Sequence, residues 1–247
     1  MIATLPMYDF AHLRNTTDRF WRLIQTELKM GPTHLTRQDD LWSMWTSPDL
    51  VLGQTCGMPF RTRLRDQVKY VITPDFGLKG CPPGFYNSVL LSRENITDLA
   101  QLDGKTIAYN ESLSQSGWAA PISFLSKHAI APKAAVKTGA HINSMRAVLS
   151  GTADFCGVDA QTFALICNMT DDFNDLRILA HTEPTPGLPY ICALRFDPKG
   201  VADAVLRAYE TLDGADKSSL RLKGFVHIDT AHYFSVPSPT SPDKMFD

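Results

Sequence analysis

A run of small hydroxyl residues follows a short apolar stretch near the middle of the chain. Residues 107–109 are apolar, and Ser114 and Ser116 follow them, before an amphipathic segment that begins at Trp118. The order strand, loop, helix places both serines where a helix leaves its first backbone N–H groups without intrahelical partners. Hydroxyl groups at that place either cap the helix or join its N–H groups in binding an anion. The run alone leaves both interpretations open.

Alternating strand and helix patterns surround this serine run. Apolar and β-branched runs predict strands at residues 2–7, 33–36, 49–52, 68–73, 85–91, 105–109, 155–158, 176–181 and 190–196, and around Val136. Apolar residues at helical spacing, or capping patterns, predict helices at residues 16–28, 39–45 (capped by Asp39 or Asp40), 118–128, 143–149, 160–167, 201–212 and 218–225. This alternation favours an α/β fold with mostly parallel sheets flanked by helices. The proline-containing residues from Pro237 on are expected to form a loose terminal segment.

Composition excludes several classes of protein. The 247 residues are 44% hydrophobic and 20% charged, which is typical of a globular chain of one large domain or two lobes. The net charge of -2 does not indicate the excess of positive charge that binds nucleic acid or an anionic membrane. No apolar run is long enough to span a bilayer. Residues 1–8 lack the features of a secretory signal, so the expectation is a cytoplasmic chain, or a periplasmic one whose signal has been removed.

The cysteines do not form a metal-binding pattern. There are five, with no CxxC pair and no histidines at zinc-like spacing, so we expect no metal and no cofactor. Cys56 and Cys81 lie in loops that contain glycine and proline, and a disulfide between them stays open. Cys156, Cys167 and Cys192 lie in apolar stretches and are expected to be buried thiols.

Short pieces of the chain, taken in order, resemble a known family. From Met7 to Pro189 they are Met7-Tyr8, Gln54-Thr55-Cys56-Gly57, Tyr86-Asn87-Ser88, Ser114-Gln115-Ser116-Gly117, Gly139-Ala140-His141 with Ser144, Gly151-Thr152-Ala153-Asp154, Val158-Asp159 and Pro186-Gly187-Leu188-Pro189. Together they resemble the PhnD-like phosphate and phosphonate substrate-binding proteins of ABC transporters, a group of the type II periplasmic binding proteins.

The resemblance implies a two-lobed α/β architecture. Residues 1–86 and 190–247 would form lobe I and residues 87–189 lobe II, joined by two crossing strands, with the ligand in a cleft between the lobes and closure by hinge bending. In open α/β sheets, ligand sites form beyond the carboxyl ends of the strands. The ligand-binding residues expected on these grounds are Tyr8, Thr55, Tyr86, Ser114, Gln115, Ser116, His141 and Asp159.

Each candidate also has a structural interpretation. His141 can donate a hydrogen bond to an anion, or serve only in packing or capping. Asp159 would repel an oxyanion, so it either holds a ligand ammonium, orients His141 or Ser116, or caps the following helix. Gln115 stands where the family often has Ser or Thr, and its longer amide changes the pocket.

The residues that would face the organic part of a ligand are equally ambiguous. Tyr8 and Tyr86 combine an apolar face with a polar tip, which suits either ligand contact or half-buried packing. Thr55 either contacts the ligand or simply ends its strand.

The expected function is capture of a small oxyanion ligand, phosphonate or phosphate, for uptake by an ABC transporter permease. No Walker loop, GxSxG elbow or HExxH motif is present, so binding without catalysis is the prediction, with no nucleic-acid partner, no membrane embedding and a monomeric state. Two alternatives stay open. One is a cytoplasmic enzyme that resembles chorismate dehydratases and acts on a carboxylate, with Asp159 or His141 as base. The other is a ligand sensor.

Overall fold

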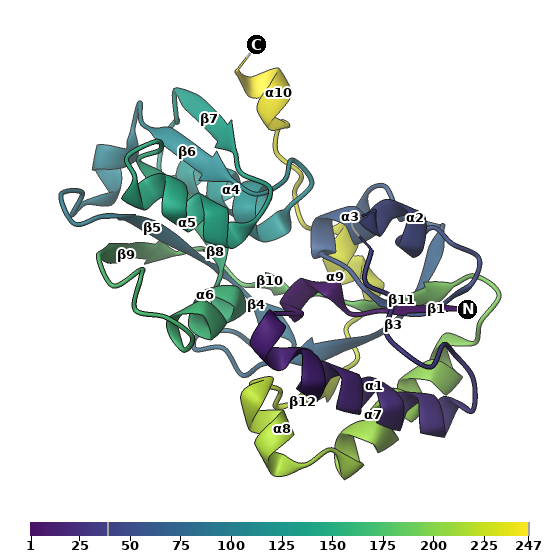
Figure 1. The fold of residues 1–247 in the computed structure, drawn as a ribbon. Helices are drawn as coiled ribbons and strands as arrows, with labels where there is room; N and C mark the ends of the chain where they lie inside the picture. The colour runs from purple at the N-terminus through teal and green to yellow at the C-terminus, as the bar shows by residue number, and fades with distance from the viewer. Residues whose placement is uncertain (39, 247) are drawn as a thin grey trace. The chain divides into compact units, whose positions relative to one another are not determined.

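The chain folds into two compact units. A computed structural model describes residues 1–38 and 40–246 (Figure 1). Unit 1 comprises Met1–Gly84 and Pro186–Phe234, and unit 2 comprises Phe85–Thr185 and Ser235–Asp247. The candidate cap Asp39 and the final residue, Asp247, lie outside the described residues.

Unit 1 is built on a five-stranded mixed sheet. The order of its strands is β1 (Ile2–Thr4), β2 (Leu50–Gln54), β11 (Tyr190–Ala193), β3 (Val68–Asp75) and β12 (Gly224–Val226). β1 and β2 are parallel, whereas β11 runs antiparallel to both of its neighbours and β12 antiparallel to β3. The carboxyl ends of β1 and β2 therefore lie at the same edge, where Tyr8 and Thr55 follow.

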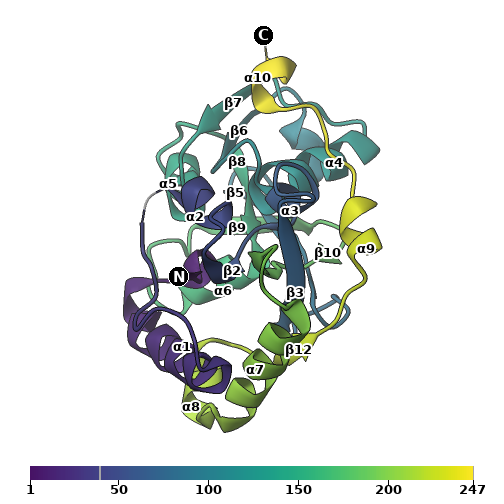
Figure 2. The same ribbon diagram turned by 90° about the vertical axis from the view of Figure 1, so that its right-hand side faces the viewer.

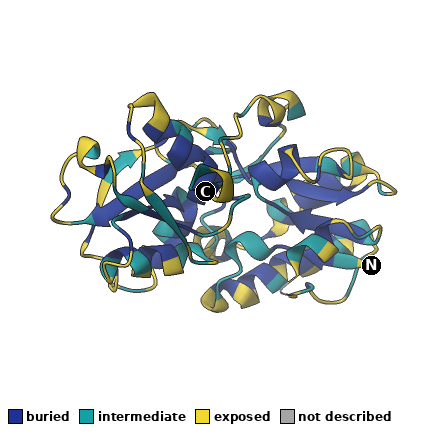
Figure 3. Ribbon diagram, turned by 90° about the horizontal axis from the view of Figure 1, so that it is seen from above, coloured by how far each residue is buried: buried dark blue, intermediate teal, exposed yellow. Residues whose placement is uncertain are grey.

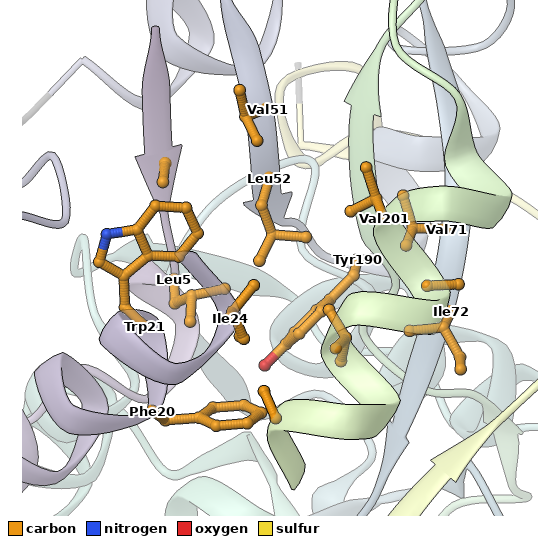
Figure 4. Packing of buried hydrophobic residues seen from close by; sticks show 14 of the residues in the cluster. Leu5, Phe20, Trp21, Ile24, Val51, Leu52, Val71, Ile72, Tyr190 and Val201 are labelled. Atoms are coloured by element: carbon orange, nitrogen blue, oxygen red, sulfur yellow. The ribbon is translucent and has the colours of Figure 1, made fainter. Parts of the chain in front are cut away.

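Two long helices cover this sheet. α1 (Arg14–Leu28) and α7 (Pro198–Thr211) lie side by side in Figures 1 and 2. α1 turns Phe20, Trp21 and Ile24 toward the strands, where they meet Leu52, Tyr190 and their neighbours in one buried cluster (Figure 4). The shorter helices of the unit are η1 (Pro6–Tyr8), η2 (Ala11–Leu13), α2 (Leu41–Trp45), α3 (Gly57–Arg61), α8 (Gly214–Ser219) and α9 (Thr230–Phe234).

Unit 2 is built on a second five-stranded mixed sheet. Its order is β7 (Ala134–Lys137), β6 (Thr106–Tyr109), β8 (Phe155–Asp159), β5 (Ser88–Arg93) and β9 (Leu176–His181). β6 is parallel to β7 and β8, whereas β5 is antiparallel to β8 and β9. The helices are η3 (Leu99–Leu102), the π-helical η4 (Gln115–Ala119), α4 (Ala120–Lys127), α5 (His141–Leu149), α6 (Ala160–Cys167) and α10 (Pro242–Met245). Figure 3 shows most strand residues buried and exposed residues on helix faces and loops.

Two short strands lie where the chain passes between the units. β4 (Phe85–Tyr86) pairs with β10 (Thr185–Pro186), and the unit boundaries fall at these strands. A third passage follows Phe234, after which the chain, yellow in Figure 2, continues from α9 to α10.

The two-lobed α/β fold expected from the sequence is confirmed, but the mostly parallel sheets are not. The chain leaves unit 1 along β3 and returns along β11, and it enters unit 2 along β5 and leaves along β9. The departing and returning strands of each pair run in opposite directions and pair antiparallel, β3 with β11 and β5 with β9.

Three local predictions were wrong. Residues 33–36 form no strand, although the backbone N–H of Thr36 donates to the carbonyl of Ala3. The helix predicted at residues 218–225 is replaced by the end of α8 and by β12, because Gly224–Val226 pairs with β3. The terminal segment, expected to be loose and part of lobe I, contains α10 and belongs to unit 2. The indole Nε1 of Trp118 donates to the carbonyl of Thr240 at 3.0 Å, and the rings of Trp118 and Phe246 meet edge to face.

The cysteines correct one further prediction. All five are free thiols, so Cys56 and Cys81 form no disulfide. Cys156 and Cys192 are buried as expected, but Cys167 is exposed, because it is the last residue of α6 and lies on its outer side.

Candidate functional site

The serine loop begins the π-helical segment of unit 2. Ser114 is its N-cap, and the hydroxyl oxygen accepts a hydrogen bond from the backbone N–H of Gly117 at 2.9 Å. The backbone N–H of Ala120 reaches back five residues to the carbonyl of Gln115. Pro121 has no N–H, and its ring would clash with the carbonyl four residues earlier in a regular α-helix. The wider π turn relieves that clash, and it sets the position of Ser116.

Ser116 and His141 form the central contact of the candidate site. The hydroxyl oxygen of Ser116 lies 2.9 Å from Nε2 of His141, although the two residues are 25 positions apart in the chain. His141 is the first residue of α5, a helix whose start has no side-chain cap. Two helix starts therefore meet at one hydrogen bond, and each presents backbone N–H groups that its own helix does not use.

Burial sets the charge state of this histidine. Burial lowers the pKa of His141 to about 4, while a hydrogen bond with the Gly157 backbone raises the pKa by less. The ring is therefore neutral at pH 7, and one of its nitrogens carries a hydrogen while the other accepts.

A set of short-range bonds fixes the loop that leads to His141. The hydroxyl of Thr138 donates to the carbonyl of Tyr109 at 3.0 Å and lies 2.7 Å from the hydroxyl of Ser144. The next residue, Gly139, adopts a φ of 81°, and its N–H donates to the carbonyl of Asn110. Since side chains other than glycine rarely adopt that φ, the loop holds the start of α5 against the end of β6.

Two glycines allow the parts of the site to approach each other closely. A Cβ atom on Gly117 would lie 1.8 Å from Oδ1 of Asn110 and 3.2 Å from Cε1 of His141. A Cβ atom on Gly157 would lie 2.2 Å from Cγ of Pro121 and 3.0 Å from the carbonyl of Ser116. Larger residues at either position would push the serine loop away from α5 or β8.

Asn110 is a site residue that the sequence analysis did not single out. Its Oδ1 is buried and accepts no hydrogen bond from the described part of the chain. The available signal was its place directly after β6, where an Asn is also an ordinary turn residue.

Asp159 makes the helix-capping contact that was one of its predicted roles. Its carboxylate accepts a hydrogen bond from the backbone N–H of Thr162 at 2.8 Å, at the start of α6. Ser88 lies opposite Asp159 in the β5–β8 register, and its hydroxyl is buried with no partner among the described residues. A second polar group thus lies beside this cap.

The remaining predicted residues are divided between the units. Tyr86 is buried in β4 and belongs, with Gln115, to unit 2. Tyr8 and Thr55 belong to unit 1. Tyr8 ends η1 and packs edge to face on Phe76, with ring centroids 5.0 Å apart. Thr55 is fully buried after β2, and its hydroxyl has no partner in the described part of unit 1.

Among the described residues there is neither a cluster of metal-binding side chains nor a membrane-spanning helix. No group of three or more His, Cys, Asp or Glu side chains in residues 1–38 and 40–246 is placed to hold a metal ion. Over the same residues, no helix combines the length and the apolar character needed to cross a membrane.

Several solved structures share this fold. PhnD1 from Prochlorococcus marinus, in complex with methylphosphonate, has a TM-score of 0.72 and 15% identity, and the alignment covers 94% of each chain. XAC2383 from Xanthomonas citri, bound to a chloride ion, has a TM-score of 0.71 and 17% identity, and the alignment covers 94% of this chain and 92% of that one. A binding-protein component of an ABC phosphonate transporter from Pseudomonas aeruginosa has a TM-score of 0.70 and 13% identity, with 94% and 82% covered.

Sequence comparison identifies the family. The comparison with curated proteins found no match. A family model described as "ABC transporter, phosphonate, periplasmic substrate-binding protein" matches residues 58–233, which is more than half of the chain. The chain therefore belongs to the family of phosphonate-type periplasmic substrate-binding proteins of ABC transporters.

Proposed function

We propose that the chain binds a phosphonate or phosphate ligand and delivers it to an ABC transporter permease, with the oxyanion held at the serine loop of unit 2. The hydrogen bond between Ser116 and His141 carries this proposal, because it joins the starts of two helices at buried donor groups. Membership of the family supports the transport role.

The donor groups suit an anion that carries several oxygens. The hydroxyls of Ser114 and Ser116, the His141 ring and the first N–H groups of α5 come from two adjacent helix starts, where the helix dipoles also favour negative charge. Ser114, Gln115 and Ser116 are buried, so an anion there would exchange water for fixed donors. Because His141 is neutral at pH 7, recognition relies on hydrogen bonds and helix dipoles rather than on a full positive charge.

The other predicted residues complete the proposed site. We assign Tyr8 and Thr55 of lobe I, with Tyr86 at the crossing, to the organic part of the ligand, and Asp159 to its far side. The ligand cleft would lie between the lobes and close by bending at the crossing strands β4 and β10. The family is periplasmic, and we place this chain in the same compartment.

Binding without turnover is the favoured chemistry. The alternative enzyme needs a general base with a pKa near the working pH, whereas the pKa of His141 is lowered to about 4. Asp159 already accepts a hydrogen bond as a helix cap. The ligand should therefore be recovered unchanged after incubation, and phosphorus NMR of the incubated ligand measures this directly.

Replacing Ser116 by Ala tests the proposed anion site. Removing one donor to a charged acceptor should weaken methylphosphonate binding by about 1–3 kcal/mol in isothermal titration calorimetry. Ser126→Ala is the matched control, since Ser126 lies exposed on α4, directly after the π-helical segment. The proposal fails if Ser116→Ala binds as tightly as the control, or if only carboxylates bind the wild-type chain.

A further inference from the structure

Trp118 lies two residues after Ser116 in the π-helical segment of unit 2, but its side chain has different surroundings. The indole is fully buried and belongs to the apolar cluster that also contains Phe155. Its ring centroid lies 5.1 Å from that of Tyr109. Ser116 instead contacts His141. Only Gly117 separates the two residues, so a displacement of Trp118 also displaces the hydroxyl that contacts His141.

The terminal segment, residues 237–246, makes two contacts with this indole. Nε1 of Trp118 donates to the carbonyl of Thr240 at 3.0 Å. The ring of Phe246 meets the indole edge to face, with the ring centroids 6.2 Å apart. The helix α10 lies between these two residues, and the backbone N–H of Phe246 donates to the carbonyl of Pro242 at 3.2 Å. The backbone of α10 therefore fixes both contacts relative to each other.

The serine loop needs such support from outside its own backbone. A π turn is a rare form of the helical backbone and is found frequently at functional sites. Even regular helices gain most of their stability from the packing of a buried face rather than from their own hydrogen bonds. The π-helical segment Gln115–Ala119 has only five residues, and Trp118 is its largest buried side chain. The packing of Trp118 is therefore the main tertiary support of this segment.

We propose that Trp118 and the terminal segment position the serine loop for anion binding. The contacts with Thr240 and Phe246 hold the indole, and the indole holds Ser116 in reach of His141. The inference rests on the proposed function for its ligand, and Trp118 acts through Ser116 rather than on the anion itself. Because coupling between two binding events is reciprocal, the anion in turn stabilises the docking of the terminal segment on unit 2.

Calorimetric titration of methylphosphonate into three variants tests the effect on binding. Trp118→Phe keeps an aromatic ring but removes the N–H group that bonds to Thr240. Phe246→Ala removes the ring that packs on the indole. Both should weaken methylphosphonate binding about threefold to tenfold, because the loop then has its binding geometry for a smaller fraction of the time. The titrations are made at a temperature at which every variant is folded.

Ile130→Val is the third variant and the matched control. Ile130 belongs to the same buried cluster but follows the far end of α4, away from the serine loop in sequence. Its shortening lowers stability without removing a contact between the indole and the terminal segment, so this variant should bind as tightly as the wild type. Equal weakening in Ile130→Val and Phe246→Ala would mean that lost stability alone explains the effect, and would overturn the inference. Unchanged affinity in both Trp118→Phe and Phe246→Ala would overturn it as well.

Nitrogen-15 NMR of the histidine rings measures the same positioning without a ligand. The chain has seven histidines, and the spectrum of His141→Gln identifies the signals of His141. Because the hydroxyl oxygen of Ser116 lies 2.9 Å from Nε2 of His141, Trp118→Phe and Phe246→Ala should shift the Nε2 signal, and Ile130→Val should not.

This second measurement separates the inference from the proposed function. If the wild type binds neither methylphosphonate nor phosphate, the proposed function fails, whereas a shifted Nε2 signal in Trp118→Phe and Phe246→Ala still supports the positioning role. If the Nε2 signal is unchanged in both variants, the inference is overturned whether or not the ligand binds.

Discussion

At the scale of single residues, the neutral state of His141 couples stability to pH. The pKa of His141 in the folded chain is about 4, below the ordinary value of about 6.5, because the ring is buried. Between these values the unfolded chain binds a proton that the folded chain does not. Stability therefore rises with pH across this window and is lost as the pH falls from about 6.5 toward 4.

Replacing His141 should make the unfolding free energy depend less on pH. We expect the wild type to lose up to about 3 kcal/mol of unfolding free energy between pH 7 and pH 4, and His141→Gln to lose less over the same range. Urea denaturation at a series of pH values measures the difference. Equal losses in the two proteins would show that His141 is not the group responsible.

At this scale, local sequence rules predict part of the geometry of the candidate site. The capping geometry of Ser114 follows from local rules, because a hydroxyl before a helix start has few other partners. The contact between Ser116 and His141 depends on how β6, β7 and α5 are placed, so local spacing could not reveal it. The close packing of Asn110 on Gly117 was missed for the same reason.

At the scale of elements, substitutions of Asp159 can distinguish its role as the N-cap of α6 from a role in ligand binding. Asp159 accepts the N–H of Thr162, and Asn is an equally good cap, whereas Ala is not. We expect Asp159→Ala to lose about 1 kcal/mol of stability and Asp159→Asn to lose little. Thermal unfolding of both variants measures this.

Ligand titration of the same variants completes the comparison. If Asp159→Asn keeps its stability but changes its affinity for 2-aminoethylphosphonate, Asp159 also contacts the ligand. If Asp159→Ala is as stable as the wild type, the hydrogen bond to Thr162 does not act as a stabilising cap.

The sequence predicted the bounds of many elements but not the direction of the strands. Hydrophobic periodicity located α1, α6 and most strands close to their observed bounds. It carries no information on direction, and the rule that alternating strands and helices run parallel fails for β3 with β11 and for β5 with β9, because one strand of each pair leads the chain out of a unit and the other leads it in. The hydrophobic pattern does not distinguish the π turn before Pro121 from an ordinary helix start.

At the scale of the whole molecule, the terminal segment packs against the core of unit 2. Met245 and Phe246 pack against the buried cluster that contains Trp118, Tyr109 and Phe155. Sequence analysis treated this segment as loose, because its prolines are typical of terminal loops and its partner lies far away in the chain.

Truncating one ring in this segment should weaken unit 2. Phe246→Ala removes partly buried apolar surface and should cost about 1–2 kcal/mol of unfolding free energy. Met169→Ala is the matched control, because Met169 belongs to unit 2 but is 46% exposed. Urea denaturation followed by tryptophan fluorescence measures both. Equal midpoints for the two variants would mean that the segment adds no stability.

The contact between Trp118 and Thr240 also imposes an order of assembly. The two residues are 122 positions apart, and the whole second segment of unit 1, Pro186–Phe234, lies between them. Closing so long a loop is entropically unfavourable until the intervening chain has become compact. Unit 1 should therefore gain its later strands before unit 2 can be completed, and the two units fold as interlocked parts of one process rather than as successive independent domains.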